Sequence, residues 1–583
     1  MLDNLPAEIL EMILNQDCLD FPDLINISST CSLLQGFVLN NNNLWRSYYR
    51  KRWFEIAERS PKIDNYFAEV SYIYKIHHEI DGILTRLTSL CMHKELLLPA
   101  DFAPFIHMIK SRCLNAEYLV HYLREILKDP SQIKTYDVVP LNTPGNLTIK
   151  YYSLETLYYL GLENFKVLWE KFISLDEDDR ILEIGAALLM KWSKPQFNIK
   201  VGKVHKEFDG IAEKVKNCLR INHPRHPLLK TNQDDSKLWR NKIIKENKFS
   251  LINSQQILST ITQVMSQNAL DKDNDPNSFT LEMFELKPGF KITRLVIFEG
   301  VARRLGVKLD WVNAPGGFLL RFIQLDNSER KIYYVDVSNG GKLILATHGS
   351  ITNPNSILDS ESVLKRIIND LAQSPHQDES LTPSILELNL RTHPTNLQAM
   401  FAFSAFYRRY NIEILPATNL RYLHRNPFTS TGSHVFTYFR HDGFPPHGMY
   451  PINPPKSPST RNGNVKFAVG MVMKHKLYNY ACVIYGWDNT CDRKAPWQQE
   501  ITYEQFKLGQ PQPFYKVLLE DGSKKYVAQG NLLQCGLKCG FDKTLKLGKY
   551  FTHFFKNQFV PNYFLNEKYP YDVEVRKQFQ LLG

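Results

Sequence analysis

The sequence predicts a multidomain α+β protein with an N-terminal three-helix unit, a helical region, an α+β domain and a small C-terminal β-barrel. A length of 583 residues exceeds what one hydrophobic core organises, and a hydrophobic content of 43% suits several well-packed domains. Helical periodicity dominates as far as about residue 250, whereas runs of β-branched and aromatic residues follow residues 316 and 465. A proline-rich segment, 441–463, is the clearest domain boundary.

The first 53 residues are predicted to form a compact unit of three helices. In "LPAEILEMIL", apolar residues recur at i, i+4, i+7 and i+8 from Leu5, which predicts a helix with one apolar stripe, and Pro6 suits its first turn. "DLINISSTCSLLQGFVL" has helical spacing from Leu24, and "NNNNLWRSYYRKRW" closes the unit with Leu44 and Trp45. An ordinary three-helix core would also explain these residues.

In their order and N-terminal position, these residues resemble the F-box family. F-box domains bind a Skp-type adaptor, which links them to a cullin–RING ubiquitin ligase. The resemblance implies that an apolar helix face and a Leu-Trp pair pack against helices of the adaptor. The residues expected to dock it are Leu5, Pro6, Ile9, Ile13, Leu24, Leu44 and Trp45.

The middle of the chain is expected to hold a helical linker region (54–175), an α+β domain (176–350) and a helical extension (351–440). In the α+β domain, the apolar helix "TRLVIFEGVARRLGV" ends at Gly306, and the strand-like runs "FLLRFIQL" and "KIYYVDVS" follow it.

Residues from about 176 to 345, above all "GFKITRLVIFEGVARRLGVKLDWVNAPGGFLLRF" and "YYVDVSNGG", resemble the transglutaminase-like family. Active members use a Cys–His–Asp arrangement. By resemblance, the nucleophile position falls at about Lys291, the histidine position is Gly317, and only Asp336 matches the triad acid. We therefore expect a catalytically empty domain. A thiol-dependent acyltransferase would need Cys113 or Cys218 to reach the site from outside the motif.

Residues 464–540 read as short strands separated by turn signals such as "WDNTCD" and "EDGS", which predicts a small β-barrel, and 541–583 reads as a C-terminal tail. "VGMVMKHKLYNYACVIYGWD", "QPFYKVLLEDGS" and "KYVAQGNL" resemble the hemimethylated-DNA-binding domain family.

The local charge gives this module only modest support as a DNA-binding surface. Residues 465–533 hold nine Lys/Arg and six Asp/Glu, a net charge of +3, whereas duplex binding normally needs several clustered cations. Since one face of each strand must form the core, most aromatic residues are expected inside. The expected substrate or DNA surface is Lys474, Lys476, Tyr478 and Tyr480.

The remaining residue patterns favour no cofactor and no metal. Residues 198–250 carry a net charge of +7 (13 Lys/Arg less 6 Asp/Glu), which fits a solvated helical face better than a polyanion site. His205, His223 and His226 are expected at the surface, without ligand spacing. The nine cysteines are dispersed along the chain, which predicts reduced thiols. There is no run of 18 apolar residues and the start of the chain is acidic, which predicts no membrane span and a location in cytoplasm and/or nucleus.

These observations predict a non-enzymatic substrate receptor of a Skp–cullin–F-box ubiquitin ligase, in the Ubl conjugation pathway. The F-box would bind the adaptor, and the transglutaminase-like and barrel domains would select a protein substrate. The alternative is a DNA-binding protein that acts through the barrel. The substrate, its degron, the domain orientation and the oligomeric state do not follow from the sequence.

Overall fold

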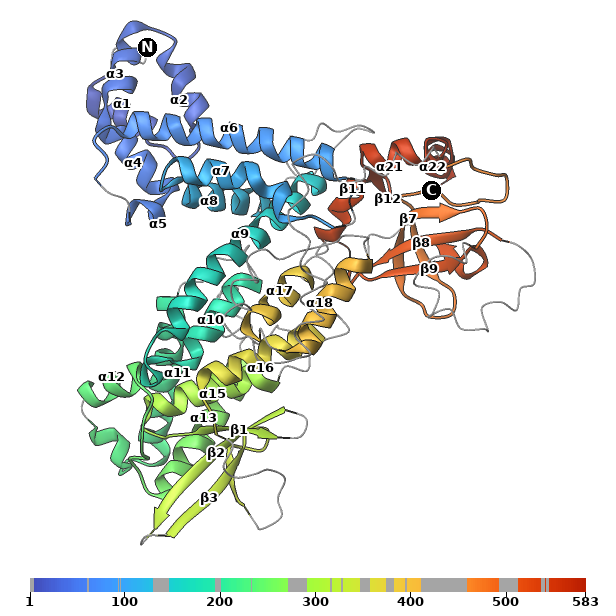
Figure 1. The fold of residues 1–583 in the computed structure, drawn as a ribbon. Helices are drawn as coiled ribbons and strands as arrows, with labels where there is room; N and C mark the ends of the chain where they lie inside the picture. Colours follow the sequence, from blue (N-terminus) through green and yellow to red (C-terminus); the bar gives the residue numbers. More distant parts are fainter. Residues whose placement is uncertain are drawn as a thin grey trace, which may run out of the picture. The chain divides into compact units, whose positions relative to one another are not determined.

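Figure 1 shows the computed structural model of the chain. It describes residues 5–59, 62–92, 94, 96–128, 146–193, 201–231, 233–270, 291–314, 317–326, 329–346, 357–373, 382–393, 396–409, 459–491, 512–535, 541 and 545–582. The chain divides into two compact units, one made of Met1–Thr156 with Asn453–Gly583 and the other of Leu157–Ile452. Most of the predicted linker 441–463 lies outside the described residues.

Short helices open the first unit: α1 (Ala7–Leu14), α2 (Phe21–Ser28), α3 (Ser32–Asn40), α4 (Asn42–Arg52) and α5 (Phe54–Ala57). The second predicted segment is therefore divided into two helices. The hydroxyls of Ser28 and Ser29 donate to the Ile25 carbonyl, and Cys31 is extended at φ −156° and ψ 160°. Such local side-chain bonds compete with the helix and end α2.

Longer helices follow in the first unit: α6 (Tyr66–Cys91), the 3₁₀ turn η2 (Pro99–Phe102), α7 (Ala103–Ser111), α8 (Asn115–Lys128) and the start of α9 (Leu147–Ile173). Buried isoleucines and leucines line α6, and the buried carboxylate of Glu69 accepts hydrogen bonds from Arg112 and Tyr118. These polar contacts connect α6 to the loop before α8 and to α8 itself, so the three segments form one packed group.

The second unit begins within α9 and continues through α10 (Leu182–Ser193), α11 (Val201–Asn222), α12 (Gln233–Asn241), α13 (Leu251–Leu270) and α15 (Lys291–Arg304), with the 3₁₀ turns η3 (Glu177–Asp179) and η4 (Pro227–Lys230). Its strands are β1 (Asp310–Ala314), β2 (Gly317–Asp326), β3 (Glu329–Asp336), β4 (Lys342–Leu345) and β5 (Ile357–Leu358), and its last helices are α16 (Ser360–Gln373), α17 (Thr382–Thr392) and α18 (Leu397–Arg409).

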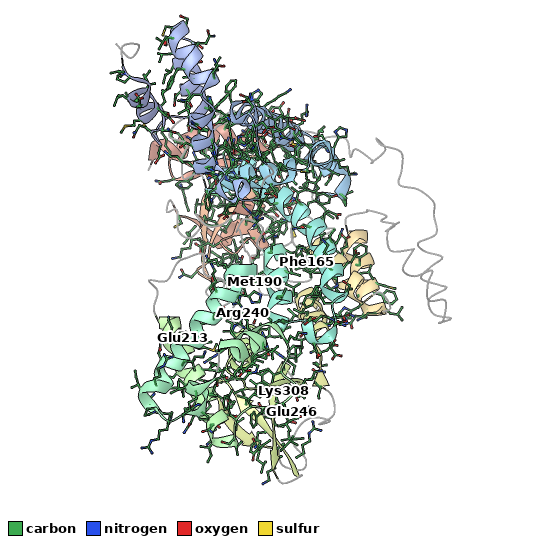
Figure 2. All side chains as sticks on the ribbon, turned by 90° about the vertical axis from the view of Figure 1, so that its left-hand side faces the viewer. Phe165, Met190, Glu213, Arg240, Glu246 and Lys308 are labelled. Carbon is green, nitrogen blue, oxygen red and sulfur yellow. The ribbon has the colours of Figure 1, made fainter. Side chains whose placement is uncertain are left out.

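One hydrophobic core joins the helices and the sheet of the second unit. The sheet is antiparallel with the order β4-β3-β2-β1-β5. Phe165 of α9 and Met190 of α10, both labelled in Figure 2, are buried in this core, as are Val363 and Leu364 of α16. The helical extension therefore shares the core of the transglutaminase-like region rather than packing separately.

The C-terminal part of the first unit contains a second antiparallel sheet with the order β10-β6-β7-β8-β9. Its strands are β6 (Val472–His475), β7 (Ala481–Asp488), β8 (Phe514–Leu519), β9 (Lys524–Ala528) and β10 (Leu532–Gln534), with the turn η7 (Gln529–Asn531). Among the described residues, β9 and β10 lie at the two ends of this order, with no pairing between them. A bulge between Ile484 and Gly486 interrupts the alternation expected along β7.

The segment expected to be a C-terminal tail forms η9 (Leu545–Lys549), β11 (Phe551–Phe555), β12 (Gln558–Pro561), α21 (Tyr563–Lys568) and α22 (Asp572–Leu582). Phe551, Phe559, Leu565 and Tyr569 from these elements are buried in the core of the second sheet. The 3₁₀ turn η9 also approaches the start of α9 so closely that a Cβ at Gly548 would lie 1.9 Å from the Leu147 carbonyl oxygen.

Buried carboxylate Asp572 fastens this C-terminal segment to the sheet. Asp572 is fully buried and accepts hydrogen bonds from the backbone N–H of Val469 (2.7 Å) and from Trp487 Nε1 (3.0 Å). Arg461 adds an ion pair of 2.6 Å. The residues bonded to Asp572 lie 85 to 111 positions away in sequence, which local patterns could not reveal.

Candidate adaptor and ligand surfaces

Helix α1 carries apolar side chains on two faces. Leu10 and Leu14, one turn apart, point into the N-terminal core and are buried. Leu5, Ile9 and Met12 are solvent-exposed, with Met12 at 65%. Because the inner stripe already satisfies the core, the exposed residues are available to a partner. We call Leu5, Ile9 and Met12 the α1 surface.

The seven residues predicted to dock an adaptor are not all placed on this surface. Leu5, Pro6 and Ile9 are exposed and Ile13 is half-buried, whereas Leu24, Leu44 and Trp45 are completely buried. In the conformation described, these last three cannot contact an adaptor directly. Sequence spacing could not distinguish the two groups, because a core stripe and a docking stripe share the period of a helix.

Trp45 has the role of a core residue. Its Nε1 donates to the Val38 carbonyl at 2.6 Å, and its ring packs against Phe21 at a centroid distance of 5.6 Å and against Phe67 at 5.2 Å. The sequence missed Met12 as a surface residue, although it lies on the exposed turn beside Ile9.

In the second unit, the Asp336 carboxylate accepts hydrogen bonds within its own turn. Its Oδ1 accepts hydrogen bonds from the backbone N–H groups of Ser338 (3.1 Å) and Asn339 (3.0 Å) and so closes the turn after β3. Gly317 has φ +150° at the start of β2, and Lys291 begins α15. The side chain of Lys291 lies outside the described residues.

The second unit contains a buried ion cluster that was not predicted from the sequence. Glu183 of α10 accepts from Arg304 at 2.6 and 2.7 Å and from Arg303 at 2.9 Å, and His205 Nδ1 lies 2.8 Å from Glu183 Oε1. Arg304 also pairs with Asp209 at 2.8 Å. The available signal was the pair of consecutive arginines that ends α15 after the largely apolar run 295–302.

The surrounding cations keep the Glu183 carboxylate of this cluster ionised. Burial raises the pKa of Glu183, but the hydrogen bonds from Arg304 and His205, with the charges of Arg303 and Arg304, lower it to about 2. The carboxylate is thus ionised at neutral pH and connects α10, α11 and α15. Because Arg303 and Arg304 are engaged in these ion pairs, they stabilise the packing of the helices rather than take part in acid–base chemistry.

The predictions for two of the three histidines need correction. His205 belongs to the Glu183 cluster with 16% of its side chain exposed, and His226 is buried. His226 Nδ1 accepts from the Leu228 N–H, while its Nε2 lies 3.1 Å from the Asn253 carbonyl oxygen. Proline and basic neighbours suggested the surface, but these polar contacts stabilise the rings inside. Across the described part of the chain, no cluster of three or more His, Cys, Asp or Glu residues suits a metal ion.

The loop between β6 and β7 contains most of the predicted substrate or DNA surface. Tyr478 is 61% exposed, Lys476 is exposed, and Lys474 and Tyr480 are partly exposed. The structure brings the two tyrosines together, with stacked rings 6.4 Å apart and 7° between their planes. Of the aromatic residues in "HKLYNYACVIYGWD", Trp487 is buried and Tyr478 alone is exposed.

Buried His475 supports this loop from beneath. Its ring lies 4.9 Å from both tyrosine rings, and its Nδ1 accepts the N–H groups of Leu477 and Tyr478 at 3.2 Å each. Burial lowers the pKa of His475, and the charge of Lys525 lowers it further, so the ring is neutral at pH 7. The neutral tautomer that leaves Nδ1 unprotonated is the one the loop requires.

Three family models match parts of the chain. Residues 2–51 match the family described as F-box-like, residues 204–350 the transglutaminase-like superfamily, and residues 465–558 the family "Hemimethylated DNA-binding protein YccV like". F-box only protein 21 of Pongo abelii is 26% identical over 613 residues, covering 98% of this chain and 92% of that protein. F-box only protein 21 of Homo sapiens is also 26% identical, over 620 residues.

The chain is similar to F-box only protein 21 along nearly its whole length. Its F-box-like, transglutaminase-like and YccV-like regions follow one another in the predicted order. No solved structure has significant similarity to the chain. Among the described helices, none is both long and apolar enough to cross a membrane.

Proposed function

We propose that this protein is the substrate-recognition subunit of a Skp–cullin–F-box ubiquitin ligase. The observation that carries the proposal is an F-box-like unit that exposes Leu5, just before α1, and Ile9 and Met12 on α1, while Leu10 and Leu14 fill its core. A helix face of this kind suits a groove on a helical adaptor. Similarity to F-box only protein 21 supports the same role.

Co-purification with a Skp-type adaptor tests the proposal. Wild-type protein should capture the adaptor, and both Leu5→Ala/Pro6→Ala and Met12→Asp should reduce capture at least about tenfold, since a few hot-spot residues dominate the binding energy of an interface. Leu90→Ser is the matched control, because Leu90 on α6 is 66% exposed and equally apolar. Capture that survives both α1 changes would disprove the adaptor role.

We propose further that the second unit is a non-catalytic scaffold. Asp336 is engaged by the turn after β3, and Cys218 is the one cysteine between residues 157 and 452. Incorporation of a labelled amine into an acyl-donor peptide checks this proposal. Neither wild type nor Cys218→Ala should incorporate label, and incorporation by wild type that Cys218→Ala abolishes would overturn it.

A DNA-binding protein is the second candidate, and the match of residues 465–558 to the family "Hemimethylated DNA-binding protein YccV like" favours it. Titration of the full chain with a labelled duplex at several salt concentrations separates the candidates. Micromolar or tighter binding near physiological salt, with a steep salt slope, would favour DNA. Both candidates are compatible with the proposed location in cytoplasm and/or nucleus.

A further inference from the structure

Large apolar side chains are exposed around the β6–β7 loop. Leu477 is 72% exposed and Tyr478 61%, and Leu533 on neighbouring β10 is 51% exposed. β10 pairs with β6 so that Leu533 lies opposite Lys474, and the Lys476 N–H donates to the Asn531 carbonyl. The loop and β10 are thus joined by backbone bonds. Adjacent exposed apolar residues of this size are typical of binding sites.

The loop is held in one conformation although its side chains face solvent. Nδ1 of His475 accepts the N–H groups of Leu477 and Tyr478, and Asn479 has a left-handed φ of 60° that completes the turn. The buried Nδ1 acceptor therefore fixes the backbone that carries the exposed leucine and tyrosine. A preorganised loop lowers the entropy that a ligand must overcome.

Cations surround these apolar residues. Lys474 and Lys476 flank His475, and the Lys525 ammonium lies 4.8 Å from the centre of the Tyr480 ring. Within the described residues, none of these three lysines forms an ion pair. Asp521 is a nearby acid; burial raises its pKa, but hydrogen bonds from Ser523 and the charges of Lys546 and Lys525 outweigh burial and lower it. The local potential therefore favours an anionic ligand.

A peptide fits this composition better than a nucleic acid. Duplex affinity grows with the number of phosphates neutralised, and three lysines give a weak site. One of them, Lys476, already donates its Nζ to the Gly530 carbonyl. Leu477 and Leu533 have no partner on a phosphate backbone, whereas an apolar side chain of a peptide would cover them.

We propose that the hairpin surface, formed by Leu477, Tyr478, Leu533, Lys474, Lys476 and Lys525, binds an acidic peptide segment of a protein substrate. Carboxylates of the peptide pair with the lysines, and a leucine-sized or aromatic side chain packs on Leu477 and Tyr478. This inference rests on the proposed substrate-recognition role and assigns the chemical class of the segment recognised.

Peptide display on the intact protein tests the inference. A library of random peptides about 12 residues long is selected on the full chain, and synthetic copies of the enriched sequences are titrated by fluorescence anisotropy. Enriched peptides should combine Asp or Glu with a bulky apolar residue. Leu477→Ser/Tyr478→Ser should weaken them at least about tenfold. Lys474→Glu/Lys525→Glu should weaken them similarly, whereas Leu90→Ser should not.

Three results would overturn the inference: enrichment of peptides without acidic residues, absence of any enriched peptide, or binding that the hairpin variants leave unchanged. Duplex DNA, with and without methylation on one strand, is titrated in parallel. Tighter duplex binding that the same variants abolish would assign the hairpin surface to nucleic acid instead. Adaptor capture is measured on every variant, so failure of the ligase role is detected separately from failure of peptide binding.

Discussion

The α1 surface and the hairpin surface both expose large apolar residues, but they differ in charge and in support. Around the α1 surface the charged side chains on the helix are Glu8 and Glu11, whereas lysines surround the hairpin surface. α1 rests on an apolar core through Leu10 and Leu14, while the hairpin depends on polar contacts made by His475. Two surfaces of opposite charge on one chain suit two different partners.

The largest effect is expected from a substitution that removes the buried carboxylate beneath the second sheet and leaves α1 unchanged. Asp572→Ala leaves Arg461 and the N–H groups of Val469 and Trp487 without their shared acceptor. We expect a loss of about 3–5 kcal/mol in the stability of this region, as for other broken buried ion pairs. Hydrogen exchange of β7 measures it. Adaptor capture should be unchanged, and its loss would show that the two surfaces are coupled.

The next effect separates the two faces of α1. Leu10→Asp places a carboxylate at a buried position in the N-terminal core and should cost about 3 kcal/mol, because burial removes the charge from water. Ile9→Asp, one residue earlier but exposed, should leave stability almost unchanged. Urea unfolding followed by far-UV circular dichroism compares the two. Equal destabilisation would contradict the assignment of the inner and outer faces.

A smaller effect concerns the polar support of the hairpin. His475→Phe keeps a ring against Tyr478 and Tyr480 but removes the acceptor of two backbone N–H groups. The cost should be about 1–2 kcal/mol. Amide exchange of Leu477 and Tyr478 should become faster. Unchanged exchange at both positions would show that the loop does not need Nδ1.

Because of His475, the stability of the folded protein should depend on pH. Burial and Lys525 hold the pKa of His475 below its ordinary value of 6.5, so the unfolded chain binds this proton at a higher pH than the folded chain. The stability from neutral His475 is complete above pH 6.5 and is lost as the pH falls below it. Melting temperatures measured between pH 7.5 and pH 5 should fall, and His475→Phe should reduce the fall.

The smallest expected effect is on stability when the hairpin surface itself is changed. Leu477→Ser/Tyr478→Ser alters two exposed residues and should change the free energy of unfolding by less than about 0.5 kcal/mol. Thermal unfolding checks this expectation. A larger loss would mean that these side chains stabilise the fold, and their exposure would then no longer indicate a binding role.

Much of the domain organisation was predictable from local residues. The helix of α1, the strands β6 to β9 and the mixed α+β class followed from periodicity and turn residues. The folded C-terminal segment did not follow, because it depends on contacts such as Phe559 N–H to the Gly470 carbonyl, between residues 89 positions apart. The break between α2 and α3 depends on local side-chain bonds that the periodicity did not reveal.

The sequence by itself determined the order of the domains and the apolar repeat of α1, because composition and spacing are local properties. Only the tertiary structure decided that Trp45 and Leu44 belong to the core while Met12 faces solvent. It alone placed Asp572 under the second sheet and His475 under the β6–β7 loop. A repeat defines a stripe along a helix or strand, but burial depends on which distant segment covers that stripe.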